Sequence, residues 1–203
     1  MTDLETGLIK SALHPFSECY VRCGPVDQIC LGDPDPEKIN LDYITNCLSG
    51  LNRFLGYTND AHFKRINVLE HSIYVYMTLV TELGQREAMS QRKLMRTALA
   101  HDFPEAYTGD IISPIKACWP AYQEWEATIM WPVLAKKYDL LDPIPEIIHA
   151  IDKAVRVEEM KLILGVGGRP DSTFYRHNIA PESIEMYFRD HWQLVAPYDR
   201  SKV

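Results

Sequence analysis

From Leu41 onward, apolar residues recur at helical spacing, whereas the first 40 residues show only weak periodicity. Glycine and proline, which favour turns, interrupt that first stretch at Gly24-Pro25, Gly32-Asp33-Pro34 and Asp35-Pro36. Short strand-like pieces at Cys19–Val21 and Gln28–Leu31 predict a small β-hairpin within it. We therefore expect an all-α protein, with an irregular N-terminal extension over residues 1–40 packed on a helical domain over residues 41–203.

Capping signals locate the first helices of that domain. Asn40 or Asp42 is the expected N-cap of a helix whose apolar face carries Ile44, Cys47, Leu48 and Leu51. Asn67 is the expected N-cap of the next helix, because Glu70 follows it at the spacing of a capping box. An apolar stripe of period 3.6 then continues to Leu83, and Gly84 suits the end of the helix.

The second half of the chain predicts further helices. Ser90 is the expected N-cap of a helix that runs through Leu99 to His101-Asp102. Three more helices are expected over residues 121–138, 145–164 and 181–191. Residues 109–114 are expected to form a loop, and the glycine-rich residues 165–170 a stop after a helix.

Composition excludes several classes of protein. The net charge of −7 argues against a protein that coats nucleic acid, which needs a basic surface. No run approaches the roughly 18 apolar residues of a membrane span, and the acidic N-terminus lacks a signal-peptide pattern. We expect a cytoplasmic protein with no membrane or nucleic-acid partner.

The five cysteines predict reduced thiols rather than disulfides, because their number is odd and a chain of 203 residues needs no covalent staples. A zinc site formed by Cys19, Cys23 and Cys30 with His14 is the weaker alternative, since the spacing is not a regular zinc pattern.

The pair His101-Asp102 is the most informative chemical feature, because two such side chains at the end of an apolar helix are costly unless they have partners. A divalent metal would satisfy both. His71 and Asp152, each on its own predicted helix, can complete the set. Taken singly, His71 is more often an ordinary histidine and Asp152 a surface residue; their order along the chain is what favours a metal site.

Two imidazoles and two carboxylates suit Mn, Co, Ni, Fe or Zn better than Ca, and Mg is also possible. Four protein ligands leave coordination positions for water and a substrate oxygen, as metal-assisted hydrolysis requires. Glu105 follows Asp102 by almost one helical turn, which places it beside the metal rather than on it.

The order His, His-Asp, Asp resembles the HD-domain superfamily of phosphohydrolases. Five segments resemble bacterial 5′-deoxynucleotidases and phage dATP triphosphohydrolase-like proteins in particular: Gly32–Ile39, Leu51–Gly56, Leu69–Ser72, Ala100–Ile111 and Pro114–Lys116. The resemblance spans roughly residues 30 to 165 and implies an HD-domain helical bundle.

The resemblance also implies roles for individual residues. One divalent metal would be bound by His71, His101, Asp102 and Asp152; Glu105 would position or deprotonate the attacking water; Asp110 would assist the water or bind the sugar 3′-hydroxyl; Arg53 and Lys116 would bind phosphate; and Phe54 would stack on the base. Arg also suits phosphate on chemical grounds, because its planar fork binds two oxygens at once. Core packing of Phe54 is nearly as good an interpretation.

The chain departs from these relatives at two places. Tyr57 stands where many of them have a histidine, so the preference for base or phosphate chain is open. Phe103-Pro104 replaces small residues, and Pro104 affects where Glu105 lies.

The leading hypothesis is a metal-dependent phosphohydrolase that converts a deoxynucleotide to the deoxynucleoside. The substrate is either a triphosphate such as dATP or a monophosphate. A triphosphate needs more positive charge, with Lys64, Arg65 and Lys116 as candidates. The alternative is a non-catalytic, nucleotide-binding or regulatory protein of the same fold. Relatives often assemble, so a homo-oligomer is expected by resemblance alone. The resemblance to phage proteins also implies the host cytoplasm as the location if the protein is phage-encoded.

Overall fold

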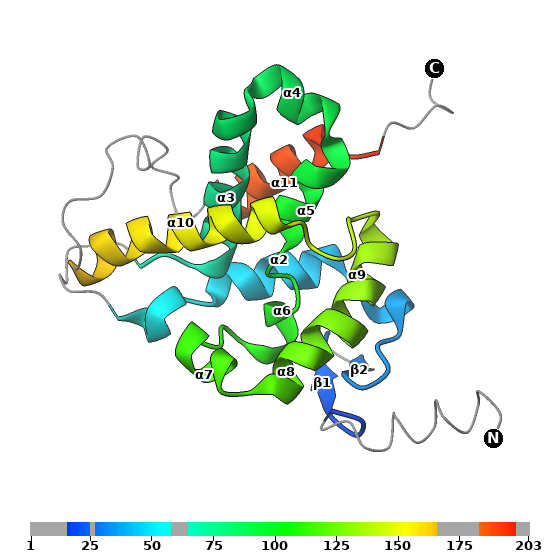
Figure 1. The fold of residues 1–203 in the computed structure, drawn as a ribbon. Helices are drawn as coiled ribbons and strands as arrows, with labels where there is room; N and C mark the ends of the chain where they lie inside the picture. Colours follow the sequence, from blue (N-terminus) through cyan, green and yellow to red (C-terminus); the bar gives the residue numbers. More distant parts are fainter. Residues whose placement is uncertain (1–15, 25–26, 58–64, 166–182, 198–203) are drawn as a thin grey trace.

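The computed structural model describes residues 16–24, 27–57, 65–165 and 183–197, and it is mostly helical (Figure 1). The α-helices are α2 (Leu41–Gly50), α3 (Val68–Leu83), α4 (Gln85–Ser90), α5 (Arg92–Ala100), α6 (Glu105–Thr108), α7 (Ser113–Ala117), α8 (Pro120–Trp125), α9 (Trp131–Tyr138), α10 (Glu146–Leu164) and α11 (Ile184–Leu194). Short 3₁₀ turns lie at Pro36–Lys38 and Arg53–Gly56. The predicted all-α class is confirmed.

Helix α3 is the centre of the bundle. Every residue from Val68 to Tyr76 is buried, because α2, α5, α10 and α11 all pack against this helix. A helix that is covered on all sides can carry polar groups into the interior only where they find partners. His71 lies within this buried half, so its imidazole needs partners inside the bundle.

The predicted N-caps of α2 and α3 are confirmed. Asn40 Oδ1 accepts hydrogen bonds from the backbone N–H groups of Asp42, at 2.7 Å, and Tyr43, at 3.3 Å. Asn67 Oδ1 accepts one from the N–H of Glu70 at 2.8 Å. These side chains satisfy backbone donors that the first turn of a helix leaves free.

The prediction that Ser90 begins a helix is wrong. Ser90 is the last residue of α4, and its hydroxyl donates to the carbonyl of Glu87 at 2.7 Å instead of capping α5. Gln91 is the residue that precedes α5. The loop predicted over residues 109–114 is also too long, because Ser113 and Pro114 open α7, where proline is well tolerated.

The single helix predicted over residues 121–138 contains a change of register. It comprises α8, a π-helical stretch at Glu126–Met130 and α9. Pro132 has no backbone N–H to donate to the preceding turn, so the regular α-helical ladder is interrupted there. Glu126 is the first residue of the π-helical stretch.

The predicted hairpin is present. Strands β1 (Tyr20–Arg22) and β2 (Gln28–Cys30) are antiparallel, with Val21 opposite Ile29. The indole N–H of Trp125 donates to the carbonyl of Leu31 at 2.6 Å, which fixes the segment after β2 against α8. All five cysteines are free thiols. The division of the chain at residue 40 stays a prediction, and His14 lies outside the described residues.

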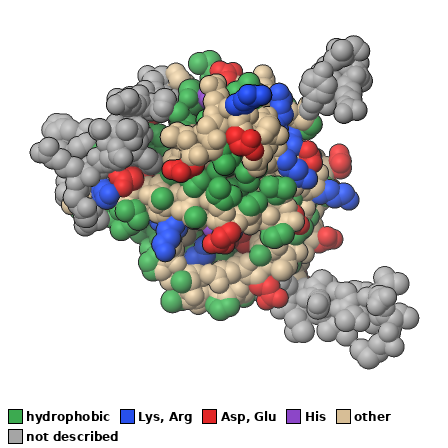
Figure 2. All heavy atoms as spheres, turned by 45° about the horizontal axis from the view of Figure 1, so that its top comes forward, with side chains coloured by type: hydrophobic (Ala, Val, Ile, Leu, Met, Phe, Trp, Pro, Cys, Tyr) green, Lys and Arg blue, Asp and Glu red, His purple; other side chains and the backbone are tan. Residues whose placement is uncertain are grey.

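None of the described helices is long and apolar enough to span a membrane. On the face drawn in Figure 2, Lys and Arg side chains are interspersed with acidic and hydrophobic ones. This mixed surface agrees with the net charge of −7.

Phe188 attaches α11 to the bundle, with its ring 6.1 Å from Phe103 and 5.9 Å from Trp192, centroid to centroid. Phe188 is fully buried, so Phe188→Ala should lower the free energy of unfolding by about 3–5 kcal/mol, measured by urea denaturation. Met186, on the same helix, is exposed. Met186→Ala should therefore change the free energy of unfolding by no more than about 0.5 kcal/mol. Equal effects of the two variants would contradict the packing of α11.

Candidate metal centre

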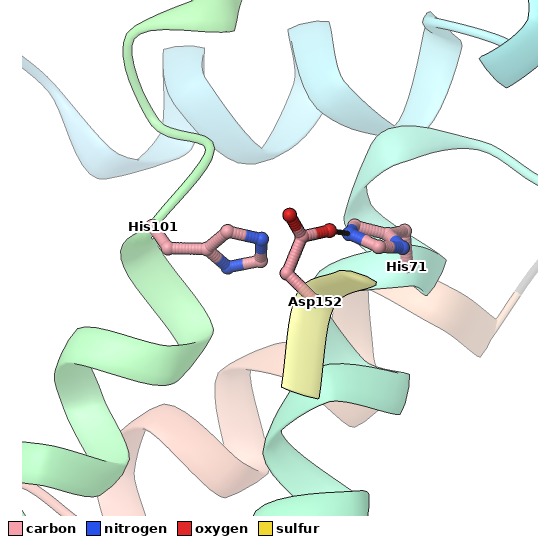
Figure 3. Close-up of side chains that lie close together, drawn as sticks. All are labelled: His71, His101 and Asp152. Atoms are coloured by element: carbon pink, nitrogen blue, oxygen red, sulfur yellow. Dashed lines mark ion pairs between the residues drawn. The ribbon is translucent and has the colours of Figure 1, made fainter. Parts of the chain in front are cut away.

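His71, His101 and Asp152 come together from three separate helical segments. His71 is on α3, His101 directly follows α5, and Asp152 is on α10; one ligand atom from each lies within 4.8 Å of the other two. In Figure 3 the Asp152 carboxylate lies between the two imidazole rings and points toward His71. Its Oδ1 is 3.0 Å from His71 Nε2.

The two imidazoles are oriented by hydrogen bonds on their far nitrogens. His101 Nδ1 lies 2.8 Å from the carbonyl oxygen of Ala98, and because a carbonyl only accepts, Nδ1 carries the proton. His71 Nδ1 is 2.8 Å from Glu159 Oε1. Both Nε2 atoms are buried and form no hydrogen bond of good geometry. Such a buried nitrogen is costly unless a ligand satisfies it, and a metal ion fits this need.

Asp102 borders the same centre. Its Oδ2 lies 3.3 Å from His101 Nε2 and 3.6 Å from His71 Nε2. Burial alone would raise the pKa of Asp102, but His101 and His71 outweigh burial and lower it. The structure therefore brings together all four residues predicted as ligands, three of them in the tightest group and Asp102 next to two of those.

The protonation of His71 is consistent with metal binding that releases protons. Burial and the Arg53 guanidinium act to lower the pKa of His71, but the carboxylates of Glu159 and Asp152 raise it to about 9. An imidazole coordinates a metal only in its neutral form. Metal binding here is therefore expected to displace a proton and to weaken as the pH falls below this value.

Glu159 is the functional residue that the sequence did not reveal. It is fully buried on α10, where its Oε2 accepts from Arg53 Nε at 2.9 Å while its Oε1 contacts His71 Nδ1. Burial would raise the pKa of Glu159, but His71 and Arg53 lower it, so the carboxylate is ionised. The available signal was its spacing of seven residues from Asp152, which puts both on one face of a helix.

A cavity of about 670 Å³ opens onto this centre. Its charged lining comes from residues on several helical segments and the 3₁₀ turn at Arg53: Arg53, Asp102, Glu105, Asp110, Lys116, Asp152 and Arg156. Its apolar lining includes Phe54, Leu55, Ile111, Ile112, Met160 and Leu164. The cavity thus has the size of a small-molecule site and contains both ionic and apolar surface.

Glu105 is the first residue of α6 and is almost completely buried. Burial, and secondly the charge of Asp102, hold the pKa of its carboxyl well above the usual range. Its Oε2 has no hydrogen-bond partner, and its Oε1 lies 3.7 Å from Lys116 Nζ. A carboxyl with this environment can hold or accept a proton near neutral pH.

Lys116, on α7, is held at the cavity by an acidic residue that the sequence did not single out. Its Nζ donates to Glu126 Oε1 at 2.8 Å, from the π-helical stretch. Burial would lower the pKa of Lys116, but Glu126 and Glu105 raise it, so the ammonium keeps its charge.

Of the other residues predicted to contact the substrate, some line the cavity and some do not. Phe54 and Asp110 line the cavity, and burial raises the pKa of Asp110. Tyr57 is 58% exposed and is not among the lining residues, so the structure does not bring it to the site. Tyr57 is the C-cap of the turn at Arg53–Gly56, where its N–H donates to the carbonyl of Phe54 at 3.0 Å. Arg65 is exposed away from the lining, and Lys64 lies outside the described residues.

Residues 55–144 match a family model described as HD domain. The match includes His71, His101, Asp102 and Glu105, and supports an assignment to the HD-domain superfamily; Arg53, Asp152 and Glu159 lie outside it. No curated protein matches the chain significantly.

Glu159→Gln should weaken metal binding by about 10–100-fold, because the neutral amide no longer fixes His71 as a carboxylate does. The measurement is a calorimetric titration of metal-stripped protein with Mn²⁺ or Zn²⁺. Glu146→Gln, an equal charge change on the exposed start of α10, is the control and should leave the affinity unchanged. Unchanged affinity in Glu159→Gln would show that the bond to His71 Nδ1 does not support the metal centre.

Proposed function

We propose that this protein is a metal-dependent phosphohydrolase that removes phosphate from a deoxynucleotide, either a triphosphate such as dATP or a monophosphate. The observation that carries the proposal is that the buried Nε2 atoms of His71 and His101, neither of which forms a hydrogen bond of good geometry, lie beside Asp102 and Asp152. Asp102 and Asp152 line a cavity that also contains cations. The domain match supports a metal-dependent hydrolase of the HD type.

The cations favour an anionic substrate. Arg53 Nε is engaged by Glu159, which leaves the outer nitrogens of the guanidinium toward the cavity, with Nη1 3.8 Å from Asp102 Oδ2. Lys116 lines the same cavity. A guanidinium and an ammonium beside a metal centre are the groups that bind and polarise a phosphate.

The donor set suits one divalent transition metal: Mn, Co, Zn, Ni or Fe, with Mg also possible. When bound, such an ion supplies Lewis-acid polarisation of a phosphoryl oxygen and a water of lowered pKa. Glu105 is placed to accept the proton of the attacking water and to return it to the leaving oxygen. Arg53 and Lys116 bind the phosphate oxygens as negative charge develops.

The remaining lining favours a nucleoside as the leaving group. Phe54 and Leu55 stand at the cavity with apolar residues of α10, which suits the faces of a nucleobase. Asp110 is positioned to accept a hydrogen bond from a sugar hydroxyl. The preference for deoxyribose rests on the resemblance of the motifs around His71, His101 and Lys116 to deoxynucleotidases.

A product-release panel tests the activity, with the deoxynucleoside measured by chromatography, because a dNTP cleaved to the deoxynucleoside yields tripolyphosphate and only a dNMP yields phosphate. Metal-stripped protein is assayed with the four dNMPs, the four dNTPs and the matching ribonucleotides, with Mn²⁺, Co²⁺, Zn²⁺ or Mg²⁺ added singly. We expect release from deoxynucleotides only with a metal. Asp102→Ala should lose metal binding and turnover together. Turnover by the metal-free protein would exclude the mechanism, and no release from any nucleotide would favour the non-catalytic alternative.

Glu105→Gln should keep the metal and lose turnover by roughly 10²–10⁴-fold in kcat, because the amide cannot accept the proton of the water. Metal content and kcat are measured on the same preparation. Loss of the metal in this variant would instead place Glu105 among the ligands, and an unchanged kcat would remove it from the proton transfer.

A further inference from the structure

Arg156 stands at the wall of the cavity on α10, one helical turn after Asp152. Its Nη2 lies 3.2 Å from Asp152 Oδ2, and its Nη1 donates to the hydroxyl of Ser113, the first residue of α7. It therefore connects the helix that carries Asp152 to the helix that carries Lys116. Its side chain is 30% exposed, so a ligand in the cavity can reach it.

The three cations of the cavity are balanced in different ways. Arg53 pairs at 2.9 Å with Glu159 and Lys116 at 2.8 Å with Glu126, and neither of these two carboxylates lines the cavity. Their contacts to cavity carboxylates are longer, 3.8 Å from Arg53 to Asp102 and 3.7 Å from Lys116 to Glu105. Among the described carboxylates, Arg156 has only that of Asp152 within 4.0 Å. Asp152 is at the same time a member of the metal-ligand group.

This difference matters once Asp152 serves as a ligand. Its Oδ1 faces His71, so its negative charge is then shared with the metal and balances Arg156 less. The guanidinium has five N–H donors, of which the contacts to Asp152 and Ser113 use two. The remaining donors and the uncompensated charge are available to an anion in the cavity.

We propose that Arg156 binds phosphate beyond the scissile group and so makes the site favour deoxynucleoside triphosphates over monophosphates. The inference rests on the proposed function and refines its substrate. Among the described residues, Arg156 takes the place of Arg65 as the source of the extra charge, because Arg156 lines the cavity and Arg65 does not. Arg53, Lys116 and the metal bind the scissile phosphate.

The test measures binding without turnover. In the Glu105→Gln background, saturated with Mn²⁺, the dissociation constants of the four dNTPs and the matching dNMPs are measured by calorimetry. Arg156→Gln should weaken dNTP binding by about tenfold or more, since a charge-assisted hydrogen bond is lost, and dNMP binding by less than about twofold. Arg156→Lys should restore part of the loss, because it keeps the charge without the fork. Lys153→Gln, an exposed residue on the same helix, is the matched control and should change neither.

Two results would overturn the inference. One is an equal loss of dNTP and dNMP binding, or a weaker affinity for Mn²⁺, in Arg156→Gln; Arg156 would then only hold Asp152 in place. The other is equal binding of dNTPs and dNMPs in the Glu105→Gln background, which would remove the preference and leave the proposed function intact. Binding of no nucleotide at all would reject the proposed function itself, and with it the inference.

Discussion

The buried carboxylate of Glu159 is the interaction on which the site depends. It joins Arg53, on the turn after α2, to His71, on α3, from its own place on α10. Burying a carboxylate costs several kcal/mol unless charge and hydrogen bonds compensate it, and here two cationic partners do so. Because the bond to Nδ1 fixes the His71 ring, Nε2 is directed to Asp152, which lines the cavity.

The same arrangement explains how an acidic protein presents cations to a ligand. Glu159 lies behind Arg53 and Glu126 behind Lys116, so these two cations are held in place by carboxylates that do not line the cavity. Among the carboxylates that line the cavity, Asp102 and Asp152 belong to the candidate metal centre and Glu105 is the proposed proton acceptor. A net charge of −7 is therefore compatible with local capture of phosphate.

Local signals in the sequence were sufficient for the caps at Asn40 and Asn67, because each depends on a short motif. The residues of the candidate metal centre were predicted from the order His, His-Asp, Asp along the chain, since His71 and Asp152 alone carry little signal. Glu159 and Arg156 could not be recognised in the same way. In the sequence both are ordinary charged residues of an amphipathic helix, and their roles depend on the rotation of α10 about its axis. The pairing of Glu126 with Lys116 joins two residues ten positions apart on different helical segments, and the exposure of Tyr57 follows a turn in which two non-glycine residues have positive φ.

That loop shows how anchoring permits strain at the site. Phe54 and Leu55 both have positive φ, at 54° and 58°, which costs non-glycine residues about 1–3 kcal/mol each. The turn is tied down at its start, where Arg53 N–H donates to the carbonyl of Ile66 and the N–H of Val68 donates to that of Leu51. The buried Arg53 side chain adds its bond to Glu159. These hydrogen bonds offset the backbone strain of the turn. In the conformation that they stabilise, Leu55 lines the cavity and is 78% exposed instead of being buried in the core. An apolar side chain held outward at such a cost is explained by a ligand surface better than by packing.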